Sequence, residues 1–184
     1  TKGTDVSWWQ PADEVWIDLV DELALDRAAP VVDVGSGSSL FVDALVGAGF
    51  EDVTAVDVSA AALESIRSRV GGRAHLVVSD VLEFVSTRPV HLWHDRAVFH
   101  FLVDPVDQVR YAQNLRASLA PQGYAIIATF APDGPDTCSG LPVRRWAAED
   151  LAEALGLTLV RSERRIHTTP WEATQPFTIA VLRP

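Results

Sequence analysis

The sequence predicts an α/β fold in which a seven-stranded, mostly parallel sheet carries helices on both faces and ends with an antiparallel C-terminal hairpin strand. Short apolar runs rich in β-branched residues alternate with segments of helical period, a pattern typical of helices packed on a parallel sheet. The last two apolar runs, residues 157–167 and 177–183, leave no room for a helix between them. They should therefore pair as an antiparallel hairpin.

The N-terminal half alternates helix and strand. Apolar residues within 11–25 recur at helical spacing, and Pro11 suits a first helical turn. Residues 30–34 form a β-branched run that ends at Gly35, as expected of a buried strand. The later elements of this half are a helix over 40–48, a strand over 53–58, a helix from the N-cap Ser59 to Val70, and a strand over 75–79.

The C-terminal half continues the pattern. The expected elements are a strand over 90–95, a helix over 105–119, a tight turn at 121–123, a strand over 124–130, a polar loop over 132–145, and a helix over 147–155 that Gly156 stops. Ligands of such sheets bind beyond the carboxyl ends of the strands. We therefore expect the functional residues in the loops that follow Val34, Val58, Ser79, Asp95 and Phe130.

Composition limits the classes of function. The 184 residues suit one domain, and 25 acidic against 15 basic residues give a net charge of −10, which disfavours nucleic acid as a partner. The single cysteine, Cys138, excludes an internal disulfide and a zinc cluster built on cysteine pairs, and we expect no metal. We find no signal-peptide pattern and no apolar run of about 18 residues, so we expect a cytoplasmic protein without a membrane span.

A glycine-containing turn follows the first predicted strand, with Asp33 just before Gly35 and Gly37. Such turns at a helix N-terminus often bind phosphate. The turn has no Gly-Lys-Ser/Thr sequence, which excludes a P-loop, and Leu40 stands where the dinucleotide fingerprint needs its third glycine.

The turn instead resembles motif I of the class I S-adenosylmethionine-dependent methyltransferases, Asp/Glu-x-Gly-x-Gly-x-Gly. Asp33, Gly35 and Gly37 match, and Ser39 replaces the third glycine. S-adenosyl-L-methionine carries no phosphate, and its methionine end carries an ammonium, which an acid beside the turn would suit. The resemblance implies a Rossmann-like sheet, S-adenosyl-L-methionine as cofactor and S-adenosyl-L-homocysteine as product. The turn at 119–124 resembles the family's Leu-x-Pro-Gly-Gly.

The resemblance also assigns cofactor contacts. Asp57 would accept hydrogen bonds from the ribose hydroxyls, although dinucleotide folds also use an acid there. Asp80 would bond the adenine amino group, and the Val81 backbone would meet the ring. Trp9 would cover the site through a cation–π contact, or serve ordinary packing. The implied cofactor-binding set is Asp33, Gly35, Ser36, Gly37, Ser39, Asp57, Val58, Asp80, Val81 and Trp9.

The substrate side is less defined. Asp95 and His100 are candidate catalytic bases or substrate anchors, although His100 could equally be an interior histidine hydrogen-bonded to backbone. Arg96 would bind an acidic substrate or pair with a carboxylate. His91 and His94 are interpreted as structural. Cys138 could contact a soft acceptor, but is interpreted as an incidental loop thiol. The expected substrate residues are Arg96, Phe99, His167 and Trp171.

Small bacterial class I methyltransferases of poorly defined substrate share the segment at 7–10 and the loop at 130–142, so the resemblance covers nearly the whole chain. It implies one domain, 1–184, made of an N-terminal cap segment and helix (1–26), a cofactor-binding core (30–130), and a substrate loop, helix and hairpin (131–184). We expect in-line methyl transfer to a small-molecule acceptor. The alternatives are a protein lysine N-methyltransferase, whose Asp-Lys-Gly-Thr-aromatic block Asp95 and Phe99 partly match, and a non-catalytic cofactor-binding protein.

Overall fold

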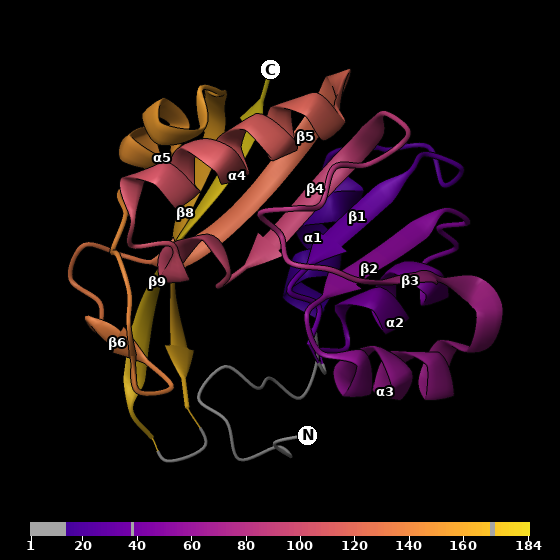
Figure 1. Cartoon of the computed structure of the whole chain (residues 1–184), viewed down its shortest axis with the longest axis horizontal. Coiled ribbons are helices and arrows are strands. Elements are labelled where there is room, and N and C mark those ends of the chain that lie inside the picture. Colours follow the sequence, from indigo (N-terminus) through magenta and orange to yellow (C-terminus); the bar gives the residue numbers. More distant parts are fainter. Residues whose placement is uncertain (1–13, 38, 170–171) are drawn as a thin grey trace.

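The computed structural model describes residues 14–37, 39–169 and 172–184, and its centre is a seven-stranded sheet (Figure 1). The order across the sheet is β3-β2-β1-β4-β5-β9-β8. The strands are β1 (Val31–Val34), β2 (Val53–Asp57), β3 (His75–Val78), β4 (Val90–Arg96), β5 (Leu119–Phe130), β8 (Thr158–Thr168) and β9 (Thr174–Arg183).

Five of these strands run parallel. β1 pairs in parallel with both β2 and β4, β2 pairs with β3, and β4 pairs with β5. β9 is antiparallel to both β5 and β8, so the C-terminal hairpin closes one edge. The predicted fold class is thus confirmed. The chain changes direction across the sheet between β1 and β4, and the carboxyl ends of these neighbours lie at the same edge.

Helices cover both faces of the sheet. They are α1 (Glu14–Glu22), α2 (Phe41–Gly47), α3 (Ala60–Val70), α4 (Pro105–Ser118) and α5 (Ala148–Leu155). One apolar cluster joins α1, α2 and α3 to side chains such as Val31 and Leu92. The other joins α4 and α5 to Val32, Val34 and Trp93. α4 and α5 lie together, away from α2 and α3, in Figure 1. Because strand side chains alternate between faces, each strand feeds both cores.

The connection between β3 and β4 contains no helix within its residues 79–89, all of which the structure describes. Val81 and Phe84 pack into the cluster of α4 and α5 instead. The Asn114 amide of α4 donates to the backbone carbonyls of Val81 and Leu82, at 3.3 and 2.8 Å. This segment is thus anchored beside the carboxyl end of β3.

Several element boundaries differ from the prediction. The described part of the first helix ends at Glu22 rather than residue 25. The predicted turn at 121–123 lies inside β5, where pairing jumps from Val90–Leu119 to Leu92–Tyr124. A Cβ on Gly123 would lie 2.7 Å from the Val90 carbonyl oxygen, so glycine is required at this irregularity.

Smaller elements also differ. β9 begins at Thr174, three residues before the predicted strand. The loop at 132–145 contains the two-residue strands β6 (Thr137–Cys138) and β7 (Leu141–Pro142), which pair with each other. Short 3-10 turns occur at η1 (Gly71–Arg73) and η2 (Phe99–Phe101). None of the helices in the described ranges is long and apolar enough to cross a membrane.

Candidate active site

A cavity of about 390 Å³ lies at the carboxyl ends of β1, β2 and β4 and extends to the residues that follow β3 and to β6. The loops that the sequence predicts at this edge of the sheet contribute to its lining. Each described residue of the predicted cofactor-binding set lines it, namely Asp33, Gly35, Ser36, Gly37, Ser39, Asp57, Val58, Asp80 and Val81. Trp9, the remaining member of the set, lies outside the described residues.

The turn after β1 depends on its two glycines. Gly35 and Gly37 have φ values of 62° and 54°, a backbone region that side-chain-bearing residues rarely adopt. A Cβ on Gly35 would lie 2.0 Å from Cγ2 of Val98, so the turn also needs glycine for space. The Ser36 hydroxyl donates to the Asp33 carbonyl at 2.8 Å and closes the turn on itself.

Asp57 ends β2 and connects two loops. Its Oδ2 accepts the Gly37 backbone N–H at 2.8 Å, and its Oδ1 accepts that of Ser59 at 2.7 Å. Ser59 in turn caps α3 through the Ala62 N–H. Backbone donors thus fix the carboxylate, and each oxygen keeps further lone-pair capacity for hydroxyl donors.

The residues after β3 continue this edge. Asp80 is exposed, and its Oδ1 accepts the Leu82 backbone N–H at 2.8 Å. Val81 is buried and contributes to both the cavity lining and the core on the α4 face. The three carboxylates Asp33, Asp57 and Asp80 therefore line one wall, as the spacing of strand ends predicts.

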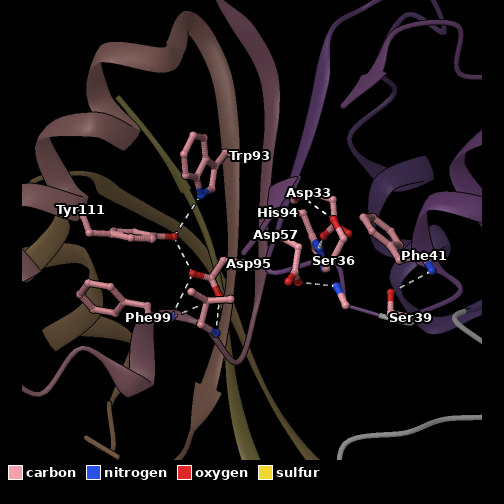
Figure 2. A network of polar contacts seen from close by, with 12 residues as sticks. Asp33, Ser36, Ser39, Phe41, Asp57, Trp93, His94, Asp95, Phe99 and Tyr111 are labelled. Atoms are coloured by element: carbon pink, nitrogen blue, oxygen red, sulfur yellow. Dashed lines mark hydrogen bonds and ion pairs between the residues drawn. The ribbon is translucent and has the colours of Figure 1, made fainter. Parts of the chain in front are cut away.

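His94 lines the cavity, although the sequence alone favoured a structural role for it. Its Nδ1 lies 2.6 Å from Oδ1 of Asp33, and both side chains are buried. Figure 2 shows this pair beside Asp57 and Phe41. This pair could not be predicted from the sequence, because it depends on the register of β1 with β4, in which Asp33 stands opposite His94.

The Asp95 side chain is buried on the opposite face of β4 from His94 and is not among the described lining residues of the cavity. Its oxygens accept the Tyr111 hydroxyl at 2.6 Å and the Val98 and Phe99 backbone N–H groups at 2.8 and 3.1 Å. The Trp93 indole N–H donates to the Tyr111 oxygen at 3.0 Å (Figure 2). Asp95 therefore anchors the segment that carries Val98 into the cavity.

Burial sets the acid–base properties of this network. It raises the pKa of Asp95 from 3.8 to about 6, against the lowering effect of the hydrogen bonds from Tyr111 and the backbone. Burial, the Asp95 charge and the hydrogen bond to it raise the pKa of Tyr111 well above its ordinary value. The tyrosine therefore stays protonated and donates to the carboxylate.

His100 and Phe99 also lie in the interior. His100 packs against Phe101 and Phe130, whose ring centroids lie 4.5 and 4.9 Å from the centroid of the imidazole. Its ring nitrogens have no hydrogen-bond partner among the described residues, so His100 is an interior histidine without the expected hydrogen bond to backbone. Burial lowers its pKa to about 4, so the ring is neutral. Phe99 packs on Tyr111 and Trp146.

The predicted substrate residues do not lie together in the structure. Arg96 lines the cavity, and its guanidinium lies 5.9 Å from the Trp16 ring centroid. His167 is buried, with its ring 6.4 Å from that of Phe177, and is not among the described lining residues. Trp171 lies outside the described residues. Phe101, Leu102, Cys138 and Ser139 also line the cavity. They lie in the loops expected after Asp95 and Phe130, but the sequence did not single out Phe101, Leu102 or Ser139 as a site residue.

Comparison with known proteins identifies the family and the fold. A model of the methyltransferase domain family matches residues 31–123, half of the chain and the part that builds the glycine turn and the strand-end carboxylates. The chain belongs to this family and is a class I S-adenosylmethionine-dependent methyltransferase. No curated protein matches it.

Solved structures share the fold at low sequence identity. A 1,6-didemethyltoxoflavin-N1-methyltransferase of Burkholderia thailandensis, solved with 1,6-didemethyltoxoflavin and S-adenosylhomocysteine, is 24% identical with a TM-score of 0.74, over 93% of this chain and 77% of that one. The N-methyltransferase NodS of Bradyrhizobium japonicum, solved with S-adenosylhomocysteine, is 19% identical with a TM-score of 0.71, over 95% and 88%. A TehB-like methyltransferase of Corynebacterium glutamicum is 18% identical with a TM-score of 0.65, over 92% and 94%.

The residues of the cavity fit the family's methyl donor. The glycine turn leaves backbone bare at the cavity wall, and the second Asp33 oxygen is buried without a partner in the described ranges. That oxygen suits an ammonium group, and Asp57 at the end of β2 suits ribose hydroxyls. When bound, S-adenosylmethionine supplies an electrophilic methyl group on a sulfonium.

Proposed function

We propose that the protein transfers this methyl group to a small-molecule acceptor. The observation that carries the proposal is that one cavity contains both the residues suited to the methyl donor and a second group of lining residues that leaves room for an acceptor. The donor wall of Asp33, Gly37 and Asp57 faces a space that Phe101 and Cys138 also line. Its volume of about 390 Å³ lies within the usual range of small-ligand sites.

In-line displacement needs alignment and exclusion of water more than covalent help from the protein. The backbone around Gly37 and the carboxylate of Asp57 would orient the donor. The apolar side chains of Val98, Phe101 and Leu102 would keep water from the acceptor. The Burkholderia methyltransferase, solved with the small molecule 1,6-didemethyltoxoflavin bound together with S-adenosylhomocysteine, supports the same class of acceptor.

The roles of Asp95 and His100 follow from their surroundings. Asp95 is enclosed by Tyr111 and backbone donors, and His100 by aromatic rings. Neither lines the cavity among the described residues. We assign both to the protein framework rather than to proton transfer, so the acceptor would attack as a thiolate, a neutral amine or another group that needs no base from these two side chains.

The similarity to lysine methyltransferases depends on Asp95 and Phe99. Both side chains are buried and make internal contacts, so they support a structural role for this block. The partial match to lysine methyltransferases therefore does not favour a protein substrate, and the labelling experiment below distinguishes the two kinds of acceptor.

The test has two stages. Calorimetric titration of the folded protein with S-adenosylmethionine and S-adenosylhomocysteine should give saturable binding of both. Gly37→Val, which puts a side chain into the donor wall at a positive φ, should remove binding, whereas Gly47→Ala on α2, with open space around its Cβ position, should retain it. A folded wild-type protein that binds neither ligand contradicts the proposal.

The second stage identifies the acceptor. Labelled S-adenosylmethionine is incubated with the protein and separate pools of thiols, amines, phenols and carboxylates, and with a protein extract. Label in one small-molecule pool supports the proposal. Label in protein alone would establish the lysine-type alternative, and binding without transfer to any pool would favour a non-catalytic role.

A further inference from the structure

A buried histidine and aspartate meet across two neighbouring strands at the donor wall. Asp33 on β1 and His94 on β4 stand opposite each other in the parallel register, so both side chains point to the same face. Nδ1 of His94 lies 2.6 Å from Oδ1 of Asp33. The two side chains are 1% and 3% exposed. Both residues line the cavity.

Aromatic packing fixes the imidazole ring. The Phe41 ring at the start of α2 lies 4.0 Å away at a tilt of 34°, and the Trp16 ring of α1 lies 5.3 Å away edge-on. A ring held on two sides has little freedom to turn. Because a carboxylate offers only acceptors, Nδ1 carries the proton of this short hydrogen bond. His94 therefore presents a fixed donor to Asp33.

The second oxygen of Asp33 is different. Oδ2 is buried and has no hydrogen-bond partner among the described residues. Asp57, in contrast, has a backbone donor on each oxygen. A buried carboxylate oxygen without a donor needs a partner, and because Asp33 lines the cavity, a bound group with N–H donors can supply it there. With its first oxygen anchored, Asp33 cannot rotate about its Cβ–Cγ bond without losing the bond to His94.

We infer that His94 is a positioning residue for the methyl donor, since it holds one oxygen of Asp33 so that the other receives the ammonium of the donor's amino-acid end. This inference depends on the proposed donor binding at this cavity. It concerns one end of the donor only. The adenosine end would contact Asp57 and Asp80, with which no hydrogen bond of His94 is found among the described residues.

The experiment uses two probes that differ only at that end. S-adenosylhomocysteine carries the amino acid, whereas 5′-methylthioadenosine has the same nucleoside and sulfur without it. His94→Phe keeps a ring between Phe41 and Trp16 but removes the N–H that donates the hydrogen bond to Asp33. It should weaken S-adenosylhomocysteine binding by about tenfold or more, because a hydrogen bond to a charged group is lost. The affinity for 5′-methylthioadenosine should change by less than about twofold.

Two further variants separate positioning from structural damage. His94→Asn places an amide N–H near the position of Nδ1 and should restore most of the affinity for S-adenosylhomocysteine. In the Asp33→Asn background, His94→Phe should cause little additional loss, because the group that it positions is already changed. Thermal unfolding of each variant checks that the fold is retained.

The outcomes are distinct. Equal weakening of both probes by His94→Phe, or no weakening of either, overturns the positioning role while the proposed function stands. Failure of His94→Asn to recover binding that His94→Phe has lost also overturns it. If the folded wild-type protein binds neither probe, the proposed function itself fails.

Discussion

Asp95→Asn tests whether the buried network on β4 is part of the framework. Asparagine has the shape of aspartate, and an amide oxygen in the place of Oδ1 can still accept the Val98 and Phe99 N–H groups, which lie 2.8 and 3.4 Å from that atom. The amide nitrogen then takes the place of Oδ2, which accepts the Tyr111 hydroxyl and a second contact from the Phe99 N–H in the wild-type protein. The substitution removes the ability of residue 95 to ionise and also the acceptor of the Tyr111 hydroxyl. The lost hydrogen bond lowers the stability of the variant by an amount that does not follow the ionisation of residue 95, so the pH dependence of the difference between the two proteins reports the buried charge.

The size and sign of the effect follow from the pKa of Asp95, which burial raises from 3.8 to about 6. Between these values the folded state binds more protons than the unfolded state, so the free energy of unfolding falls as the pH rises. The full loss amounts to about 3 kcal/mol, of which roughly 1.4 kcal/mol occurs between pH 5 and 7.5. Asparagine does not titrate, so this part of the loss is absent in the variant.

Urea unfolding at pH 5, 6, 7 and 7.5 measures the effect. We expect the unfolding free energy of Asp95→Asn, relative to wild type, to increase by about 1.4 kcal/mol over this range. Asp150→Asn, an exposed substitution on α5, controls for the change in net charge. Parallel profiles for wild type and Asp95→Asn would refute the reasoning, as would a variant that keeps its fold and donor binding but loses all methyl transfer.

Three other substitutions test the site and its support. Asp57→Ala should weaken S-adenosylmethionine binding in calorimetry by about 1–3 kcal/mol, since ribose hydroxyls would lose a charged acceptor; an unchanged dissociation constant would exclude the ribose role. Gly35→Ala should destabilise the protein by more than about 1 kcal/mol in urea, because φ is 62° and the new Cβ would lie 2.0 Å from Val98 Cγ2, whereas Gly47→Ala should cause no loss. Tyr111→Phe should lower the unfolding free energy by about 2–5 kcal/mol, because the Trp93 indole N–H is left unpaired and Oδ2 of Asp95 keeps only the Phe99 N–H; a loss below about 1 kcal/mol would argue against that network.

The fold was predictable because its signals are local. β-branched runs such as residues 31–34 and 53–57 are buried strands, and Gly35 and Ser59 punctuate them as turn and cap residues do. The predicted element boundaries were wrong where contacts between distant parts of the chain decide them. The irregularity in β5 around Gly123 results from the pairing with Val90, which no local propensity encodes.

The cavity lining was predictable at the strand ends and poorly predictable in the loops beyond them. Lining residues such as Gly35, Asp57 and Asp80 lie at or just after strand ends, so chain position alone brings them to one edge. The rest of the lining includes Phe101 in η2 and Ser139 between β6 and β7, elements that have no sequence period to reveal them. Their place depends on how the loops fold back over the sheet.

The neighbours His94 and Asp95 show why residue type alone could not assign roles at this edge. A strand turns successive side chains to opposite faces, so one points toward the helices α1 and α2 and lines the cavity, while the other points toward α4 and bonds Tyr111. Both are buried and polar, and both stand at the carboxyl end of the same strand. Substitution at residue 94 should therefore act mainly on donor affinity and substitution at residue 95 mainly on stability, the reverse of what proximity to the strand end suggests for Asp95.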